Sequence, residues 1–124
     1  MSYARRLTVA VTTASDGSAT VYSSVIDYGL LSQIRYIKTD FSDGSTFTIT
    51  AEATGETLWT EAAVNASATR APRQATHSTA GAAALYASGG TAVNDKIAIV
   101  NDRIKIVIAS GGSVKSGAFH FVLI

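Results

Sequence analysis

The side chains of this chain that could transfer protons or bind a metal are few and widely separated. Its two histidines are His77 and His120, and no carboxylate lies close to either of them in the sequence. A histidine that acts as a general acid or base needs a group that orients it. His120 lies between Phe119 and Phe121, and we expect its ring on the opposite face of a strand from theirs. Neither histidine is predicted to be catalytic.

Acidic residues give two further patterns that could carry chemistry. Glu52, Glu56 and Glu61 lie on or beside neighbouring predicted strands, where two of them could form a glycosidase-like carboxylate pair. The alternative is that they are solvated charges at strand edges. Asp40 and Asp43 resemble the start of a calcium loop, but the ordered oxygen ligands and the terminal glutamate of an EF-hand are missing. A turn explains these two aspartates better than a metal site does.

Nucleophile and phosphate-binding motifs are also missing from the sequence. No serine lies in a Gly-x-Ser-x-Gly elbow, and the Gly89-Gly90 and Gly111-Gly112 pairs lack the lysine and the helix of a phosphate-binding loop. The chain has no cysteine, so a disulfide or a cysteine-bound metal cannot support the fold. We therefore predict a protein that is not an enzyme and that has no catalytic residues, no cofactor and no metal.

Composition indicates a subunit of an assembly. The length of 124 residues predicts a single domain, residues 1–124. A net charge of +1 excludes the dense basic surface of a dedicated nucleic-acid binder. Only 15% of the residues are charged, against roughly 25% in average soluble proteins. A small, neutral surface is desolvated at little cost, so we expect it to be buried against other proteins.

Targeting and membrane signals are not evident in the sequence. Residues 1–6 lack the apolar region of a secretory signal, and no stretch approaches the roughly 20 apolar residues of a membrane span. We expect synthesis in the cytoplasm and no membrane partner.

Apolar residues alternate with polar ones in short runs, which predicts an all-β fold. The clearest run is 46–53, where Phe47, Ile49 and Ala51 alternate with threonines. About eight strands at regular spacing favour a β-sandwich, either jelly-roll or immunoglobulin-like. The predicted strands are 6–13, 19–26, 30–38, 46–53, 56–60, 96–100, 103–109 and 118–124.

Small turn residues separate these runs and predict how the strands are connected. The tetrapeptide Ser-Asp-Gly-Ser occurs at 15–18 and at 42–45, and Asp-Gly is typical of tight hairpins. We also expect hairpins at 54–55 and at 101–102. The irregular spacing around 23–24 predicts a bulge or a kink, and Tyr28-Gly29 is expected to interrupt the strand pattern.

Residues 61–81 lose this periodicity and are predicted to form one long loop. Long loops inside a compact domain are uncommon and are usually functional, so the segment is a first candidate for an interaction element. Arg70 and Arg73 flank Pro72 and could bind carboxylates of another subunit, or they could be solvated. We predict Arg70, Arg73, Trp59 and Tyr86 as interface residues, with a core position as the alternative for Trp59.

Four segments together resemble small structural proteins encoded among the head and tail genes of tailed bacteriophages. They are the start at residues 1–9 (MSYARRLTV), the strand and turn at 47–55 (FTITAEATG), the loop 71–73 (APR) and the strand 103–108 (RIKIVI). The resemblance spans nearly the whole chain but carries no site signature. It implies a location in the virion, the major capsid protein or other virion proteins as partners, and assembly as a homo-oligomer.

Our first hypothesis is a capsid decoration, or cement, subunit that stabilises the mature head. The resemblance also includes neck, tail and fibre components. A carbohydrate-binding module for host attachment is a further alternative, and it requires that Trp59, Tyr22, Tyr28 and Tyr36 form an exposed shelf.

Overall fold

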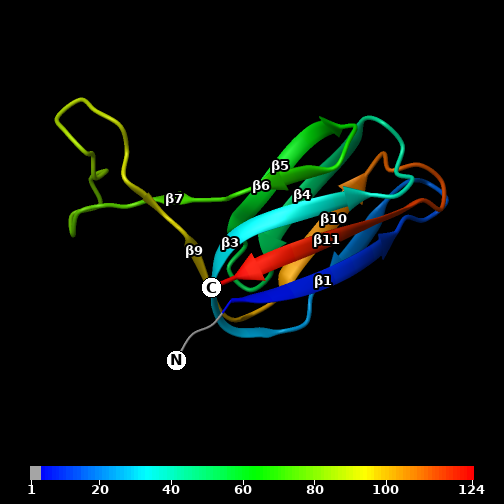
Figure 1. The fold of residues 1–124 in the computed structure, drawn as a ribbon, viewed down its shortest axis with the longest axis horizontal. Coiled ribbons are helices and arrows are strands. Elements are labelled where there is room, and N and C mark those ends of the chain that lie inside the picture. The colour runs from blue at the N-terminus through cyan, green and yellow to red at the C-terminus, as the bar shows by residue number, and fades with distance from the viewer. Residues whose placement is uncertain (1–3) are drawn as a thin grey trace.

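Residues 4–124 are described by the computed structural model, and they form two packed β-sheets with a long projection at one end (Figure 1). We call the first sheet the β3 sheet. Its strands run in the order β1-β11-β3-β6, and β9 also pairs with β3. Their bounds are β1 (Arg5–Thr12), β3 (Ile26–Lys38), β6 (Ala68–Arg70), β9 (Ile97–Asp102) and β11 (Ser116–Leu123).

The second sheet, which we call the β4 sheet, has four strands in the order β2-β10-β4-β5. Their bounds are β2 (Ala19–Tyr22), β4 (Ser45–Ala51), β5 (Thr57–Val64) and β10 (Ile104–Ala109). The short strands β7 (Gln74–Ala75) and β8 (Asn94–Asp95) form a separate two-stranded pair. The prediction of an all-β sandwich is confirmed, and no helix that could cross a membrane occurs within residues 4–124.

The core forms between the two sheets from the residues that alternate along the strands. Phe119, Phe121 and Leu123 of β11 are fully buried, as are Phe47 and Ile49 of β4. Full burial of one such side chain contributes about 1.5–3 kcal/mol, so the alternating residues hold the sheets together without a disulfide.

Both Ser-Asp-Gly-Ser turns cross from one sheet to the other, so the hairpins predicted there are wrong. The first turn joins β1 to β2, and the second joins β3 to β4. The turn chemistry itself is as expected: Gly17 and Gly44 both have a φ of 85°, and the Asp16 carboxylate accepts a hydrogen bond of 3.0 Å from the Ser18 backbone N–H. Turn residues reverse the chain locally, but they do not determine which strand it then pairs with.

The predicted hairpin at 101–102 is wrong for the same reason, because β9 lies in the β3 sheet and β10 in the β4 sheet. Asp102 stabilises this corner. Its buried carboxylate accepts hydrogen bonds from the backbone N–H groups of Ala53 at 2.9 Å and Arg103 at 2.7 Å. The hairpin predicted at 54–55 is confirmed, since β4 and β5 pair directly and Ile49 lies opposite Trp59.

The predicted strand 19–26 is divided, and the kink expected near residues 23–24 is confirmed. β2 ends at Tyr22 in the β4 sheet, and β3 begins at Ile26 in the β3 sheet. Ser23 holds the crossing point, because its hydroxyl accepts a hydrogen bond of 2.9 Å from the Ile104 N–H. The interruption predicted at Tyr28-Gly29 is wrong, since β3 continues through both residues for 13 residues in all.

The predicted loop 61–81 is replaced by three structural pieces. β5 continues to Val64, β6 adds to the edge of β3, and residues 71–96 form a projection with a two-stranded base, which we call the arm (Figure 1). Paired backbone positions hold the arm together, namely Gln74 with Asp95, His77 with Ala83 and Leu85 with Ala92. The described residues form eleven strands, and the three beyond the eight predicted are β6, β7 and β8.

Candidate interaction surfaces

The glutamates considered for a carboxylate pair are each bound to an arginine instead. Glu52 pairs with Arg103, with 2.7 Å between Oε1 and Nε and 2.9 Å between Oε2 and Nη2. Glu61 pairs in the same two-pronged way with Arg70. These hydrogen bonds lower the pKa of both carboxyl groups, so they remain ionised near neutral pH. Within residues 4–124, no three histidine or acidic side chains gather around a possible metal position.

The Arg70–Glu61 pair links the two sheets at one edge of the sandwich. Arg70 lies on β6 in the β3 sheet, and Glu61 lies on β5 in the β4 sheet. The Arg70 Nε lies 2.8 Å from Oε1 of Glu61, which also accepts a hydrogen bond of 3.0 Å from the Trp59 indole. The guanidinium lies 5.5 Å from the centre of the Trp59 ring. Trp59 is only 6% exposed, so it occupies the core position that the sequence left open as an alternative. Arg70 likewise contacts residues of its own chain, namely Glu61 and Trp59.

The other two predicted interface residues, Arg73 and Tyr86, lie on the arm. Arg73 is exposed at the base, where its Nη1 donates to the carbonyl oxygen of Ser32 at 3.0 Å. Tyr86 is 76% exposed, more than any other large hydrophobic side chain of the described residues. Their interface role stays a prediction, and it now belongs to a defined element.

The arm is built almost entirely from exposed, uncharged residues. None of its residues 71–96 is buried, and residues 74–94 include no aspartate, glutamate, lysine or arginine. Leu85 is 43% exposed beside Tyr86. A two-stranded ribbon in water is marginally stable without an apolar surface to pack on. Within the described residues, the arm therefore has little apolar packing to stabilise it.

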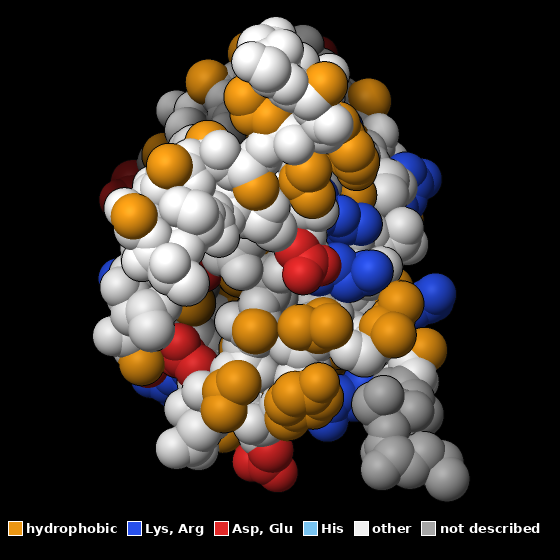
Figure 2. Space-filling model, turned by 90° about the vertical axis from the view of Figure 1, so that its left-hand side faces the viewer, with side chains coloured by type: hydrophobic (Ala, Val, Ile, Leu, Met, Phe, Trp, Pro, Cys, Tyr) orange, Lys and Arg blue, Asp and Glu red, His pale blue; other side chains and the backbone are white. Residues whose placement is uncertain are grey.

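A second exposed apolar surface, which we call the root patch, lies where the arm joins the sandwich. It consists of Tyr28 and Leu30 on β3, their cross-strand partners Val100 and Ala98 on β9, and Ile124. The Ile124 backbone exchanges hydrogen bonds of 2.9 and 3.0 Å with Leu30. Tyr28 is 55%, Val100 60% and Ile124 46% exposed. Figure 2 shows hydrophobic side chains gathered below the arm at this end of the molecule, with charged side chains between them and the arm.

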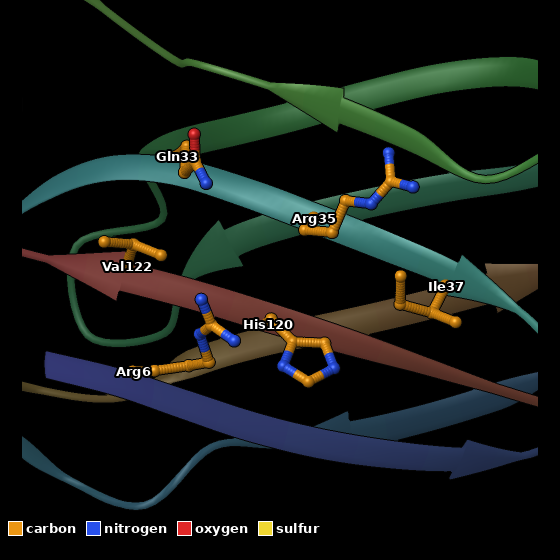
Figure 3. Close-up of a pocket in the computed structure, with 6 residues that line it drawn as sticks. All are labelled: Arg6, Gln33, Arg35, Ile37, His120 and Val122. Carbon is orange, nitrogen blue, oxygen red and sulfur yellow. The ribbon is translucent and has the colours of Figure 1, made fainter.

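A third surface, the basic groove, lies on the outer face of the β3 sheet and has a volume of about 230 Å³ (Figure 3). Strand pairing assembles it from distant parts of the sequence. Arg6 on β1 lies opposite Val122 on β11, which lies opposite Gln33 on β3, while His120 lies opposite Arg35. The groove is lined by Arg6, Gln33, Arg35, Ile37, His120 and Val122, which include no carboxylate.

Two threonines contact two of the polar side chains of the groove, His120 and Arg35. The Thr8 hydroxyl lies 3.2 Å from Nδ1 of His120, and Arg35 donates a hydrogen bond of 3.0 Å to the Thr69 hydroxyl. His120 lies on the outer face, away from the rings of Phe119 and Phe121, as the sequence predicted. The guanidinium groups in the groove are suited to an anionic group such as a carboxylate.

The aromatic shelf required by the carbohydrate-binding alternative does not form. Tyr36 and Trp59 lie in the core, and the Tyr22 ring lies beneath the Arg103 guanidinium, 3.9 Å away. Of the four residues, only Tyr28 is more than half exposed. The shelf does not form because the four aromatic residues are spread over β2, β3 and β5, and two of them, Tyr36 and Trp59, face the core.

Comparison with known proteins gives distant structural neighbours only. No family model and no curated protein matches the sequence. Among solved structures, the chain is similar to a chain of infectious bursal disease virus, Gt strain, with 14% identity and a TM-score of 0.31 over 98% of this chain. A chain of the Gx strain of that virus gives 16% identity and a TM-score of 0.30 over 97%. This chain covers 32% of each of those viral chains, about a third of their length.

Proposed function

We propose that this protein is a structural subunit of a virus particle, specifically a decoration subunit that binds and stabilises the mature head of a tailed bacteriophage. The observation that carries the proposal is the arm. Residues 71–96 contribute no buried side chain to the sandwich, yet their backbone is paired, residues 74–94 carry no Asp, Glu, Lys or Arg, and Leu85 and Tyr86 are exposed. Such an element is suited to adhesion. The resemblance of four sequence segments to phage head and tail proteins supplies the context.

The mechanism follows from mass action. A subunit that binds the assembled shell more tightly than its separated parts shifts the equilibrium toward the intact particle. The neutral arm loses little hydration when it is buried, so most of its apolar contact area contributes to binding. No chemical step is needed for this activity.

The basic groove gives the subunit a second, electrostatic contact. The guanidinium groups of Arg6 and Arg35 are suited to carboxylates on the major capsid protein. Charged contacts of this kind orient a partner and accelerate association more than they add affinity. The arm and the groove thus offer the shell two different contacts, one uncharged and one positively charged.

The test is to mix the purified protein with expanded capsids that lack a decoration protein, then to measure co-sedimentation and the melting temperature of the capsids. We expect saturable binding and a higher capsid melting temperature. The double variant Leu85→Ala/Tyr86→Ala should bind at least tenfold more weakly. Val114→Ala is the matched control, because Val114 is 63% exposed but lies outside the arm, the root patch and the groove.

Failure of the protein to co-sediment at saturating concentration would remove the decoration role. Binding to purified necks or tails under the same conditions would instead assign the subunit to that part of the virion.

A further inference from the structure

The sandwich is open along one side, where the edge strands of its two sheets lie next to each other. β1 is an edge strand of the β3 sheet and β2 is an edge strand of the β4 sheet, and the two strands are neighbours in space. The opposite side is linked by the Arg70–Glu61 ion pair between β6 and β5. Within residues 4–124, no hydrogen bond or ion pair joins β1 to β2.

The backbone of β1 presents a row of unpaired donors and acceptors on this open side. Of the described strands, only β11 pairs with β1, and the register between them is unbroken. The Thr13 N–H donates to the Lys115 carbonyl oxygen at 2.8 Å, which fixes the alternation along the strand. Odd-numbered residues direct their N–H and C=O groups toward β11, so the even-numbered residues direct theirs away from it. The even-numbered residues are Arg6, Thr8, Ala10 and Thr12.

This edge of β1 lacks the features by which proteins usually prevent the addition of a strand. Protected edges are short, bulged, interrupted by proline or charged. β1 has eight residues, no proline and no register shift, and it has no charged side chain from Thr8 to Thr12. An edge of this length and regularity is a template for a further strand.

Apolar side chains of the core are partly exposed on the same side. Leu7 on β1 and Ala19 and Val21 on β2 pack against the core but are only partly buried. A strand added to β1 would direct every second side chain toward the interior, where these three residues lie. Apolar side chains at those positions would complete the burial of the three residues. The edge therefore favours a strand in which apolar and polar residues alternate.

The start of β1 favours a negative charge in the added strand. Arg5 and Arg6 line a hollow of about 440 Å³ together with Ala4 and Val122, and Arg6 also lines the basic groove (Figure 3). The residues that line the hollow and the groove include no carboxylate. Opposite charges at facing positions of neighbouring strands stabilise a sheet, so an acidic residue is the best match opposite Arg6.

We propose that β1 accepts an extended segment of another protein as an additional antiparallel strand of the β3 sheet. The segment has apolar residues at alternate positions, directed toward Leu7 and Val21, and an acidic residue opposite Arg6. Every pairing within the β3 sheet is antiparallel, which favours the same direction for the added strand. In this mode of recognition, main-chain hydrogen bonds provide affinity and alternate side chains provide specificity. The proposal goes beyond the proposed function and does not depend on the arm.

A synthetic peptide tests the proposal on the native protein. The probe is Thr-Val-Thr-Val-Thr-Val-Glu with a fluorescent dye at its N-terminus, so that its glutamate lies opposite Arg6 and its valines face the interior. Two further versions carry N-methyl groups, one on the threonine and glutamate amides and the other on the valine amides. In an antiparallel pair, the first version loses the donors that face β1, and the second loses only donors that face away from it. Fluorescence anisotropy measures binding.

We expect the native protein to bind the unmethylated probe at one saturable site. The peptide methylated on its threonine and glutamate amides should bind at least tenfold more weakly than the peptide methylated on its valine amides. Arg6→Gln should weaken binding of the probe about threefold, and it should leave unchanged the binding of a probe with glutamine in place of glutamate.

A variant of the edge provides the matching test on the protein. Ala10→Pro removes a donor from the open edge and keeps the hydrogen bonds to β11, so it should weaken binding of the probe at least tenfold. Ala10→Ser keeps the donor and should bind like the native protein. Thermal melting checks that each variant is folded, and Thr12→Pro, at the end of the strand, replaces Ala10→Pro if that variant does not fold.

Three results would overturn the proposal. They are no binding of the probe to the native protein, equal binding of the two methylated peptides, and self-association of the native protein in sedimentation velocity that Ala10→Pro abolishes. The second would indicate apolar contact without strand pairing, and the third would indicate that a second copy occupies the edge. The proposed function fails separately, because a protein that binds the probe but not capsids keeps the strand-accepting edge and loses the decoration role.

Discussion

Tyr36 carries a polar group into the aromatic centre of the core. The side chain is fully buried, its ring is stacked 5.2 Å from Phe119, and it makes an edge contact with Phe47 at 4.7 Å. Its hydroxyl has no hydrogen-bond partner among the described residues, and burial raises the pKa of Tyr36 to about 12. Tyr36 therefore stabilises the core through the packing of its ring, and not through a hydrogen bond of its hydroxyl.

Tyr36→Phe is therefore expected to retain the fold and to raise the free energy of unfolding by up to about 1 kcal/mol, because it removes an unpaired buried hydroxyl. Urea denaturation measures the change. Phe119→Ala is the contrasting variant and should lose about 3–5 kcal/mol through the cavity that it leaves. A Tyr36→Phe variant less stable than the native protein would show that the hydroxyl has a partner.

The hydrogen bonds of Glu61 make the free energy of unfolding depend on pH in the acidic range. The hydrogen bond from Arg70, followed by the one from Trp59, lowers the pKa of Glu61 below its ordinary value of 4.5. A carboxyl group whose pKa is lower in the folded state stabilises the fold above its unfolded pKa, and this contribution disappears as the pH falls through the folded value.

We expect the melting temperature to fall as the pH is lowered below about 4.5, and we expect Glu61→Gln to show a shallower fall over the same range. Glu56→Gln is the control, since Glu56 is exposed on the same hairpin and forms no ion pair within residues 4–124. Equal slopes for native protein and Glu61→Gln would contradict a role of this ion pair in stability.

At the scale of elements, the corner between β9 and β10 depends on one carboxylate. Asp102 is 8% exposed and receives two backbone N–H groups where the chain passes from one sheet to the other. Asp102→Ala should destabilise the protein by about 1–3 kcal/mol in urea denaturation, because those donors lose their acceptor. Asp95→Ala, on the exposed arm, should change stability by less than about 0.5 kcal/mol.

The arm should be removable without loss of the fold. Gln74 and Asp95 are paired at its base, so a short Gly-Ser linker can replace residues 74–95. Because no residue of the arm is buried, we expect the free energy of unfolding to change by less than about 1 kcal/mol, measured by urea denaturation. Capsid binding should be at least tenfold weaker in the same variant, because Leu85 and Tyr86 are removed with the arm. Unfolding on removal of the arm would show that it is part of the sandwich.

The sequence predicted the strands well and their partners poorly, and β1 shows why. Alternation of apolar residues depends only on which face is buried, so it identified β1, β4 and β11 directly. Pairing depends on contacts between residues far apart in the chain. β1 pairs with β11 and not with β2, the next strand along the chain, which no turn signal encodes.

At the scale of the whole molecule, the basic groove adds a long-range electrostatic contribution to binding. The double variant Arg6→Gln/Arg35→Gln should bind capsids more weakly and with less dependence on salt, because salt screens contacts between exposed charges. Co-sedimentation at several ionic strengths gives both quantities. Lys105→Gln, on the other sheet, is the control and should retain the native salt dependence. An unchanged salt dependence in the double variant would exclude the groove from the interface.

The groove also shows the limit of sequence reasoning about the site. Arg73 was predicted as an interface residue because it lies in the aperiodic segment 61–81, and Tyr86 was predicted as an aromatic anchor outside that segment. Arg6, Arg35 and His120 come from three distant strands and meet only after β11 pairs with β1 and β3. Their one local signal is that each occupies an outward position of its strand, a property shared by every solvated strand residue. The root patch was not predicted from the sequence for the same reason.

The position of β11 has a consequence for biosynthesis. This strand lies between β1 and β3, so strands more than 100 residues apart in the sequence are hydrogen-bonded neighbours, as Arg6 and Val122 show. While the ribosome is still translating residues 116–123, the facing edges of β1 and β3 have no partner, and the β3 sheet cannot close. The sheet can therefore form fully only after residues 116–123 are available, and shorter chains present unpaired edges that are prone to aggregation.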